Sequence, residues 1–338
     1  MNAVITGQVA EIEKYGHARL DITIEDFSNA GFALGDIITV TAGTFTGDML
    51  CLNGYYVDRG EPMLRAYPGH TNISLCVNYG KFAEIAGVDA GDPVTITLKE
   101  KAGALTLQEI NNLTYTNDRA DYASDAVFAN FRVVKEGKLY RSASPVDNQY
   151  NRARFANALI QEAGVRAVMN MASTEEEINA CFAAKDFASP YYKELYEAGK
   201  VILLGLPVNF ASDEFSAGIV KGFTFLSQQD TPFLVHCTEG KDRAGFAAMM
   251  LEMLMGWNEN EIVADYMVSY ANYYGIETGT EKYDMIEEKN VKEMMRSVAG
   301  LETGAPLEGI DWKAAAEAYL MGQGMGESAL KTLEQKLQ

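Results

Sequence analysis

The residues with the clearest potential for chemistry lie in one short stretch, VHCTEGKDRAGF, at positions 235–246. It brings together one of the three histidines, His236, one of the four cysteines, Cys237, and a Lys-Asp-Arg triplet. The apolar segment TPFLV precedes this stretch, and the apolar run AGFAAMMLEMLM ends it and continues beyond it. This order predicts a buried strand, a polar loop that begins at Cys237, and a helix that starts near Arg243.

A loop between a strand end and a helix start is suited to bind an anion. The first amides of a helix have no partner within it, and a loop wrapped before them can aim further N–H groups at the same point. Gly240 lets the backbone turn without a Cβ clash. The residues expected to bind phosphate are Thr238, Glu239, Gly240, Lys241 and Ala244.

Cys237 is the predicted nucleophile, because nearby amides and the helix dipole favour its thiolate form. Arg243 offers a planar fork for two phosphate oxygens. Together they predict in-line attack on phosphorus, a cysteinyl-phosphate intermediate, and hydrolysis of that intermediate by water. We expect His236 to orient the backbone and thiolate of Cys237 rather than to act as a base.

The leaving oxygen needs a proton, and two carboxyl groups are candidates for the general acid. Asp242 lies inside the loop, directly before Arg243. Asp213 lies in VNFASDEF, which follows the preceding predicted strand. From the residues alone, Asp242 is the first candidate and Asp213 the second.

The composition limits the classes of partner. The net charge of −19 disfavours nucleic acid and anionic membranes, although a local pocket can still take a small anionic substrate. No apolar run reaches the roughly 18 residues of a membrane span, so we expect no stable membrane insertion. The N-terminus lacks a signal-peptide pattern, which predicts a cytoplasmic protein, and secretion after removal of a leader stays open.

The cysteines and histidines predict neither a metal site nor a cofactor. The chain has no CxxC motif and only three histidines, which argues against structural zinc. Scattered cysteines are typical of reduced thiols in a reducing compartment. The four are Cys51, Cys76, Cys181 and Cys237.

The 338 residues, 48% of them hydrophobic, favour two domains. Residues 1–115 predict an all-β domain, because alternating or β-branched segments such as ARLDITI and DIITVTA are separated by Gly and Asp. AGFALGDIITVTA (30–42) echoes AGVDAGDPVTITL (86–98), either as two similar strand starts or as a duplication. The polar segment 111–124 predicts the domain boundary.

Residues 120–338 predict an α/β domain with a helical C-terminal extension. A hairpin turning at Glu136-Gly137 comes first, followed by apolar strands at 165–172, 200–208 and 231–237 that alternate with helical segments. Strands that are apolar throughout and joined by helices imply a parallel sheet covered on both faces.

The loop HCTEGKDRAG resembles the HCxxxxxR signature of the Cys-based protein tyrosine phosphatases, and more closely their bacterial atypical branch, whose loop reads HCxxGKDR. The resemblance covers roughly residues 120–300 and includes KLYRSASP (138–145) and DYMVSYANY (265–273). It implies that Asp242 rather than Asp213 is the general acid. Lys241 is similar to a lysine in the loop of phosphatases that handle phosphoinositides.

Three departures from this branch bear on activity. Ala244 replaces a Ser or Thr whose hydroxyl can stabilise the departing thiolate, which implies slower hydrolysis of the phosphoenzyme. Asn170-Met171-Ala172 stands where the branch has Asp-Leu-Arg, so a supporting ionic contact is expected to be missing. Glu239 places a carboxylate beside the mouth, where it would repel polyanions or favour cationic flanks.

The N-terminal part resembles another family. ISLCVNYGKFAEIAGVDAGDPVTITL (73–98) and GQVAEIEKYGHARLDI (7–22) are similar to the C-terminal β-barrel of S-adenosylmethionine hydroxide adenosyltransferases. The catalytic domain of that family has no counterpart here. The resemblance therefore implies a small β-barrel accessory domain without adenosyl chemistry.

The resulting hypothesis is a metal-independent phosphomonoesterase with a Cys nucleophile. Its substrates would be phosphotyrosine, phosphoserine or phosphothreonine in proteins, phosphorylated small molecules, or phosphoinositide headgroups. The alternatives are an inositol-polyphosphate phosphatase and a phosphate-binding pseudophosphatase without turnover. The sequence does not indicate an oligomeric state.

Overall fold

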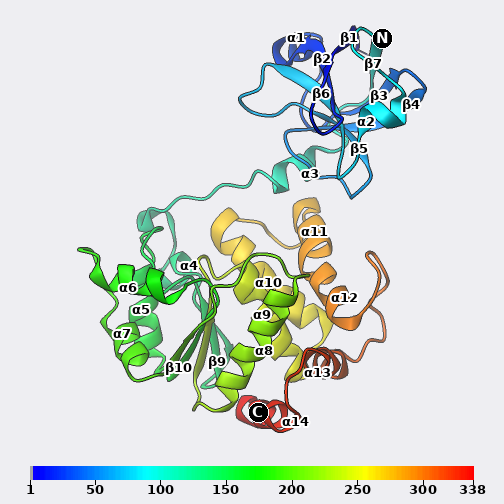
Figure 1. Cartoon of the computed structure of the whole chain (residues 1–338). Coiled ribbons are helices and arrows are strands. Elements are labelled where there is room, and N and C mark those ends of the chain that lie inside the picture. The colour runs from blue at the N-terminus through cyan, green and yellow to red at the C-terminus, as the bar shows by residue number, and fades with distance from the viewer. Residues whose placement is uncertain (1–2) are drawn as a thin grey trace. The chain divides into compact units, whose positions relative to one another are not determined.

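The computed structural model describes residues 3–338, and the chain forms two compact units that divide between Leu113 and Thr114 (Figure 1). Each unit has its own core. The domain limits expected from the sequence, 1–115 and 120–338, stay a prediction.

The first unit is a closed barrel of seven strands in the order β1-β2-β6-β5-β4-β3-β7, so the expected β-barrel is confirmed. All neighbouring strands are antiparallel except β4 and β5, which are parallel. The strands are β1 (Val4–Ile12), β2 (Ala18–Thr23), β3 (Ile37–Ala42), β4 (Phe45–Leu52), β5 (Pro62–Arg65), β6 (Asn72–Val77) and β7 (Pro93–Glu100). The helices are α1 (Ile24–Asn29), α2 (Phe82–Ala86) and α3 (Leu105–Ile110).

Apolar and polar residues alternate along strands of this barrel such as β3, so that one face of the strand is buried. In β3, Ile38 and Val40 are fully buried in the core, while Thr39 and Thr41 between and after them are not. Successive side chains of a strand point to opposite faces, so this pattern buries one face of the strand. The pattern that predicts strands in the sequence is therefore the one that fills the barrel.

The two segments that echo each other in sequence adopt the same turn. The carboxylate of Asp36 accepts the amide hydrogen three residues before it at 2.7 Å, and that of Asp92 does the same at 2.8 Å. Each Asp follows a glycine with positive φ, 88° at Gly35 and 95° at Gly91. The echo corresponds to a repeated start for the neighbouring strands β3 and β7.

The second unit contains a five-stranded sheet in the order β11-β10-β12-β9-β8. Four strands are parallel, and β8 is an antiparallel edge strand that forms the expected hairpin with β9. The strands are β8 (Arg132–Lys135), β9 (Leu139–Ser142), β10 (Ala167–Asn170), β11 (Val201–Leu203) and β12 (Phe233–His236). The second apolar segment, expected to form a strand at 200–208, forms the shorter strand β11.

Helices cover both faces of this sheet (Figure 1). On one face, Val168 and Leu234 pack in a cluster with Ile160 and Tyr192, which come from α5 and α7. On the other face, α8 lies so close to β10 that a Cβ at Gly222 would come within 2.4 Å of the Met169 methyl carbon. The expected α/β fold with two covered faces is confirmed.

The helices of the second unit precede the sheet in sequence, connect its strands or follow it. They are α4 (Asp125–Phe128), α5 (Ala153–Glu162), α6 (Glu175–Ala183), α7 (Pro190–Glu197), α8 (Asp213–Ser227), α9 (Asp242–Leu254), α10 (Glu259–Tyr274), α11 (Glu281–Glu287), α12 (Glu293–Ala299), α13 (Trp312–Gly322) and α14 (Glu327–Leu337). Two short helical turns, η1 (Arg119–Asp121) and η2 (Glu288–Lys292), complete them.

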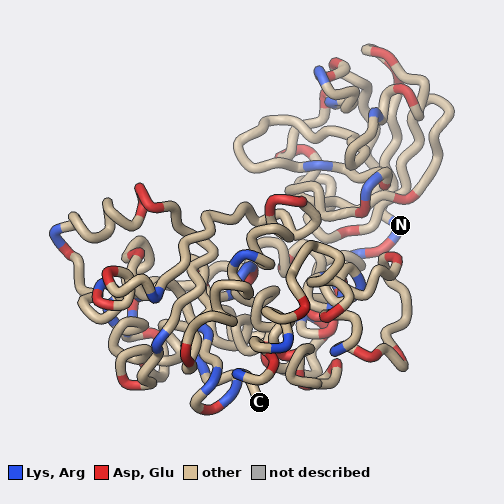
Figure 2. The backbone as a smooth tube through the Cα atoms, turned by 60° about the horizontal axis from the view of Figure 1, so that its bottom comes forward, with Lys and Arg blue, Asp and Glu red and all other residues tan. Residues whose placement is uncertain are grey.

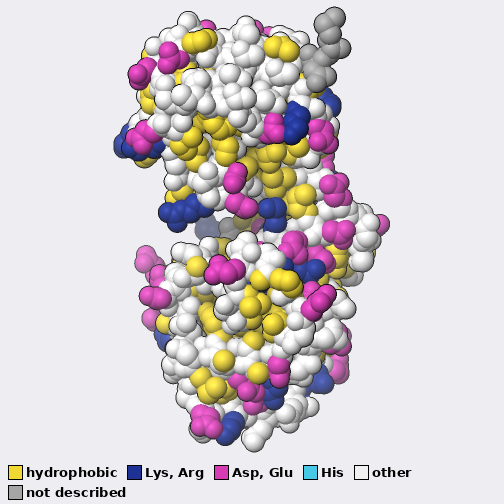
Figure 3. Space-filling view, turned by 90° about the vertical axis from the view of Figure 1, so that its right-hand side faces the viewer, with side chains coloured by type: hydrophobic (Ala, Val, Ile, Leu, Met, Phe, Trp, Pro, Cys, Tyr) yellow, Lys and Arg dark blue, Asp and Glu magenta, His cyan; other side chains and the backbone are white. Residues whose placement is uncertain are grey.

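Acidic residues are distributed along both units rather than gathered in one patch (Figure 2). Charged and hydrophobic side chains are mixed over the face drawn in Figure 3. Within residues 3–338, each helix is too short or too polar to cross a bilayer.

Candidate active site

The predicted nucleophile lies at the carboxyl end of the central part of the sheet. β12 runs between β10 and β9, and its last residue, His236, pairs with Asn170 and Ser142. Cys237 follows and is only 3% exposed. In open α/β sheets, ligands bind outside the carboxyl ends of the strands, so Cys237 stands where a ligand is expected.

The loop after Cys237 is held from the outside through its carbonyl oxygens. Asn130 donates from Nδ2 to the carbonyl oxygens of Glu239 and Gly240, at 3.1 and 3.2 Å. The Tyr273 hydroxyl donates to the Glu239 carbonyl at 2.6 Å, and Arg141 donates to the Gly240 carbonyl at 2.9 Å. These bonds fix the direction in which the loop peptides point.

The amide groups of the loop have no such partners. Within the described chain, no backbone N–H of residues 238–242 donates a hydrogen bond. The N–H and C=O of a trans peptide point in opposite directions, so carbonyls bound on the outside turn the amides inward. Inward amides at the start of α9 are the geometry that an anion cradle requires.

Gly240 is required by the path of the loop. Its φ is 71°, in the left-handed region that residues with a Cβ disfavour. A Cβ at this position would lie 2.3 Å from the carbonyl carbon and oxygen of Ser142. The loop therefore packs directly against the backbone at the end of β9.

Arg243 is fixed by groups from other strand ends. Its Nη1 donates to the carbonyl oxygen of Leu206 at 2.8 Å and lies 3.5 Å from that of Met171. Its Nη2 donates to Thr238 Oγ1 at 3.0 Å. A guanidinium anchored in this way loses little conformational entropy when it binds two phosphate oxygens.

Lys241 and Asp242 lie side by side at the start of α9. Lys241 Nζ donates to the Tyr274 hydroxyl at 3.1 Å and lies 3.9 Å from Asp242 Oδ2. Burial raises the pKa of Asp242, and the nearby Glu239 carboxylate raises it further, while Lys241 and Arg243 oppose both effects. A carboxyl group with a raised pKa keeps its proton at higher pH, as a general acid must.

The Glu239 side chain at the edge of the loop is bonded to Tyr115, which comes shortly after the first unit in sequence. Tyr115 donates its hydroxyl hydrogen to Glu239 Oε1, and Lys241 Nζ lies 3.5 Å from Glu239 Oε2. The Tyr115 ring stacks on Tyr273 with centroids 4.8 Å apart. The Glu239 carboxylate is thus held beside the mouth by one tyrosine and one lysine.

His236 is completely buried, and burial lowers the pKa of its imidazole to about 4. Its Nδ1 lies 3.2 Å from the carbonyl oxygen of Cys237. A neutral imidazole does not supply positive charge to the thiolate. This contact supports the orienting role proposed for His236.

A buried ionic network lies behind the loop. Arg141 Nη1 contacts Asp265 Oδ2 at 2.6 Å, and Arg132 Nε contacts Asp265 Oδ1 at 2.7 Å. Burial alone would raise the pKa of Asp265, but the two guanidinium groups hold it well below its usual range. Burial and the Asp265 charge raise the pKa of the adjacent Glu252 well above its usual range.

The second candidate for the general acid is placed differently from the first. Asp213 is exposed in the first turn of α8, where Ser212 caps the helix. Among the described residues, it forms no hydrogen bond or ion pair with the loop. Its position in the first turn favours a role at the helix N-terminus, where a negative charge is stabilised.

Two of the three departures from the resembled branch, Asn170 and Ala244, are uncharged residues. Asn170 accepts the amide hydrogens of Ala172 and Ser173 at 2.9 and 3.0 Å and donates to the Tyr192 hydroxyl at 3.0 Å. It therefore holds the turn after β10 through neutral bonds. Ala244 is fully buried in α9.

Several supporting residues were not predicted from the sequence. Asn130, Tyr115 and Tyr273 bind the loop, and Arg141 and Asp265 form the network behind it. Arg141 and Asp265 fall inside the two segments that carry the family resemblance, but no role was inferred for them. Their sequence context could have indicated this role. Arg141 lies within a buried strand and Asp265 within a largely buried helix, and a charged side chain in such a place requires a buried partner.

Across residues 3–338, no cluster of three or more His, Cys, Asp or Glu side chains could hold a metal ion. The positive groups at the loop are the side chains of Arg243, Lys241 and Arg141 and the backbone amides.

The chain is similar to known proteins in sequence and in structure. Residues 121–338 match a sequence model described as the tyrosine phosphatase family. A Cupriavidus necator protein, provisionally named a tyrosine-protein phosphatase, is 44% identical over 48 residues, and these cover 14% of this chain and only 18% of that protein.

Two solved structures are also similar. TpbA of P. aeruginosa in complex with phosphotyrosine is 16% identical with a TM-score of 0.32, covering 57% of this chain and 91% of that one. The core catalytic domain of the PP-IP phosphatase SIW14 of S. cerevisiae, in complex with citrate, is 17% identical with a TM-score of 0.29, covering 51% and 91%.

Proposed function

The chain belongs to the tyrosine phosphatase family, and from this we propose that it hydrolyses phosphate monoesters through a cysteinyl-phosphate intermediate. The observation that carries the proposal is the loop from Cys237 to Arg243. Its carbonyls are bound from outside, its amides are free for a ligand, and its arginine is anchored at the strand ends. This arrangement is suited to three phosphate oxygens held above one sulfur atom.

In the first step, Cys237 Sγ attacks phosphorus, so an S–P bond forms while the bond to the leaving oxygen breaks. Asp242 gives its proton to that oxygen. Arg243 and the loop amides stabilise the charge on the remaining phosphate oxygens. In the second step, water attacks phosphorus, Asp242 takes up a proton of the water, and the S–P bond breaks to release phosphate.

We propose a monophosphate ester as the substrate, with phosphotyrosine in a protein or peptide favoured. The mouth offers one lysine, Lys241, whose charge is shared with Glu239 and Asp242. Several unpaired cations would be needed to bind an inositol polyphosphate or a phosphoinositide headgroup. The rings of Tyr115 and Tyr274 beside Glu239 and Lys241 favour an aryl group instead.

The test compares phosphate release by the full chain from a phosphotyrosine peptide, a phosphoserine peptide, a phosphoinositide and inositol hexakisphosphate. We expect the highest kcat/KM on the phosphotyrosine peptide, and loss of activity in Cys237→Ser. Cys181→Ser, which removes a half-buried thiol on α6, is the matched control and should keep full activity.

The possible outcomes separate the candidate functions. A preference for inositol hexakisphosphate would replace the proposed substrate with a polyphosphate. Tight binding of vanadate without turnover on any of the four substrates would show a phosphate-binding pseudophosphatase.

A further inference from the structure

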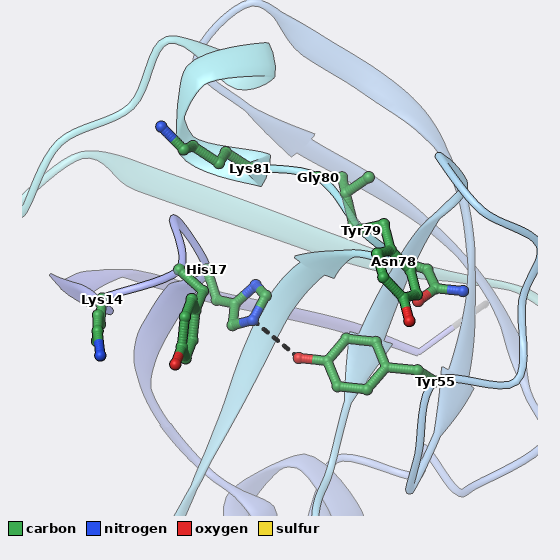
Figure 4. Close-up of a pocket in the computed structure, with 9 residues that line it drawn as sticks. Lys14, His17, Tyr55, Asn78, Tyr79, Gly80 and Lys81 are labelled. Atoms are coloured by element: carbon green, nitrogen blue, oxygen red, sulfur yellow. Dashed lines mark hydrogen bonds between the residues drawn. The ribbon is translucent and has the colours of Figure 1, made fainter. Parts of the chain in front are cut away.

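The β-barrel contains a second concave site that plays no part in the proposed reaction. It is a cavity of about 700 Å³ between the segments around β1–β2, β4–β5 and β6–α2. In Figure 4, His17 faces Asn78 and Tyr79 across the cavity, with Lys81 and Tyr55 on the other sides. Cavities of this size are typical of small-molecule sites.

Aromatic rings are exposed at this cavity. Three of its lining residues are tyrosines, and their exposed fractions are 66% for Tyr15, 40% for Tyr55 and 82% for Tyr79. Tyr79 also has a φ of 56°, in the left-handed region. A large ring held in the solvent by strained backbone has no role in the barrel core, and such strain is frequent at ligand sites.

A buried donor in the cavity wall has no partner. His17 is 8% exposed, and its Nε2 lies 2.8 Å from the Tyr55 hydroxyl. Arg65 donates to the same hydroxyl at 2.8 Å, so the Tyr55 proton is available for His17 Nε2. A neutral imidazole that accepts at Nε2 carries its proton on Nδ1, which has no hydrogen-bond partner among the described residues.

Basic side chains gather around the cavity although the chain is acidic. Lys14 and Lys81 line it, and Arg59 lies over the Tyr79 ring at 4.9 Å. Arg65 lies over the Tyr55 ring at 5.5 Å. Lys81 and Arg65 also contact Glu84 and Glu13, at 2.7 and 3.4 Å. Positions 1–113 contain only seven Lys and Arg residues, and the two lysines and two arginines named here are four of them.

We propose that this cavity binds a small planar aromatic ligand that carries an anionic group. The exposed tyrosines stack on the ring. The imidazole N–H of His17 meets an acceptor on the ligand, and Lys14 with its basic neighbours attracts the anion. Two sources share this chemistry, a free mononucleotide and the phosphotyrosine side chain of a peptide.

The test is isothermal titration of the full chain, with vanadate at saturation so that the catalytic loop is occupied. The probes are guanosine monophosphate, uridine monophosphate and a phosphotyrosine peptide. Ribose 5-phosphate, which has the anion without the ring, and guanosine, which has the ring without the anion, are the ligand controls. We expect at least one probe to bind and both controls to bind far more weakly.

The matched variants are Tyr79→Ala, which removes a ring of the cavity, and Tyr67→Ala, which removes an exposed tyrosine of the same unit that does not line it. We expect Tyr79→Ala to weaken binding roughly tenfold and Tyr67→Ala to leave it unchanged. Circular dichroism of both variants checks the fold.

Which probe binds identifies the source of the ligand, nucleotide or phosphopeptide. Equal binding of ribose 5-phosphate and the ring-containing probes, or no binding by any probe, would overturn the proposal. Phosphatase activity is measured separately, so failure here leaves the proposed reaction untouched.

Discussion

The buried guanidinium of Arg141 donates a hydrogen bond to the carbonyl oxygen of Gly240 over 2.9 Å, and it contacts Asp265 on its other side. The phosphate loop is therefore tied to an ionic network in the interior of the second unit. Arg132 contacts the same Asp265 and reaches the loop only indirectly, because its Nη1 donates to Asn130 Oδ1 at 3.0 Å. The two arginines therefore allow a direct and an indirect contact with the loop to be compared.

We expect Arg141→Lys and Arg132→Lys to lower the free energy of unfolding by similar amounts, about 1–3 kcal/mol each, because each loses charged hydrogen bonds. Arg141→Lys should also lower kcat/KM and weaken vanadate binding, by roughly tenfold or more and by more than Arg132→Lys, because it loses a direct bond to the loop. Urea unfolding and phosphatase assays on both variants measure this. Equal losses of activity in the two variants would contradict a special role for the direct bond from Arg141 to the loop.

Gly240→Ala should remove activity, because its Cβ would overlap the backbone of Ser142. A displaced loop is expected to lower kcat/KM by roughly 100-fold. Gly137→Ala is the matched control. Its φ of 64° is also left-handed, but no atom lies within 4 Å of the added Cβ. That variant should lose about 1 kcal/mol of stability and keep its activity. A fully active Gly240→Ala would contradict the packing described for the loop.

Asp242→Asn should slow hydrolysis of phosphotyrosine by roughly 10²–10⁴-fold and spare an aryl phosphate with a good leaving group. The reason is that a general acid matters only when the leaving oxygen is basic. Because the pKa of Asp242 is raised, wild-type activity on phosphotyrosine should persist to higher pH than an ordinary Asp would allow. Asp213→Asn is the control, and if it alone shows the leaving-group dependence, the assignment of the acid is wrong.

His236 predicts a specific pH dependence of stability. Its pKa is lowered to about 4 in the folded chain, against an ordinary value near 6.5. Between these values the unfolded state binds the proton and the folded state does not, so stability falls as the pH falls. The contribution of His236 should decrease by about 2 kcal/mol from pH 7 to pH 5.

The measurement is urea unfolding of the wild type and His236→Asn at both pH values. The difference in stability between the two proteins should change by that amount, because all other titrating groups are shared. A difference that is constant from pH 7 to pH 5 would show that the imidazole is not held neutral by burial.

Local patterns in the sequence were sufficient to predict the strands and helices and the loop that follows Cys237. Apolar runs such as TPFLV predict buried strands, and the hairpin at Glu136-Gly137 follows from its turn residues. The order of Cys237, Gly240 and Arg243 predicts an anion cradle, because strand end, turn and helix start follow one another directly. These inferences need no knowledge of distant parts of the chain.

The residues that hold the loop in place could not be predicted from local patterns. Asn130 and Tyr115 bind residues more than 100 positions away, and no local pattern specifies such a pairing. Asn130 also has a φ of 47°, which is set by its place in the fold. The cavity around His17 likewise depends on three segments that only barrel closure brings together.

The central claim is that Cys237 carries the phosphoryl group during turnover. The most direct measurement is mass spectrometry of the full chain after rapid acid quench with a phosphotyrosine substrate. The account predicts a mass increase of one phosphoryl group on the peptide that contains Cys237, absent from Cys237→Ser and present in Cys181→Ser. Turnover with no phosphorylated Cys237 peptide at any quench time, or activity that survives in Cys237→Ser, would contradict it.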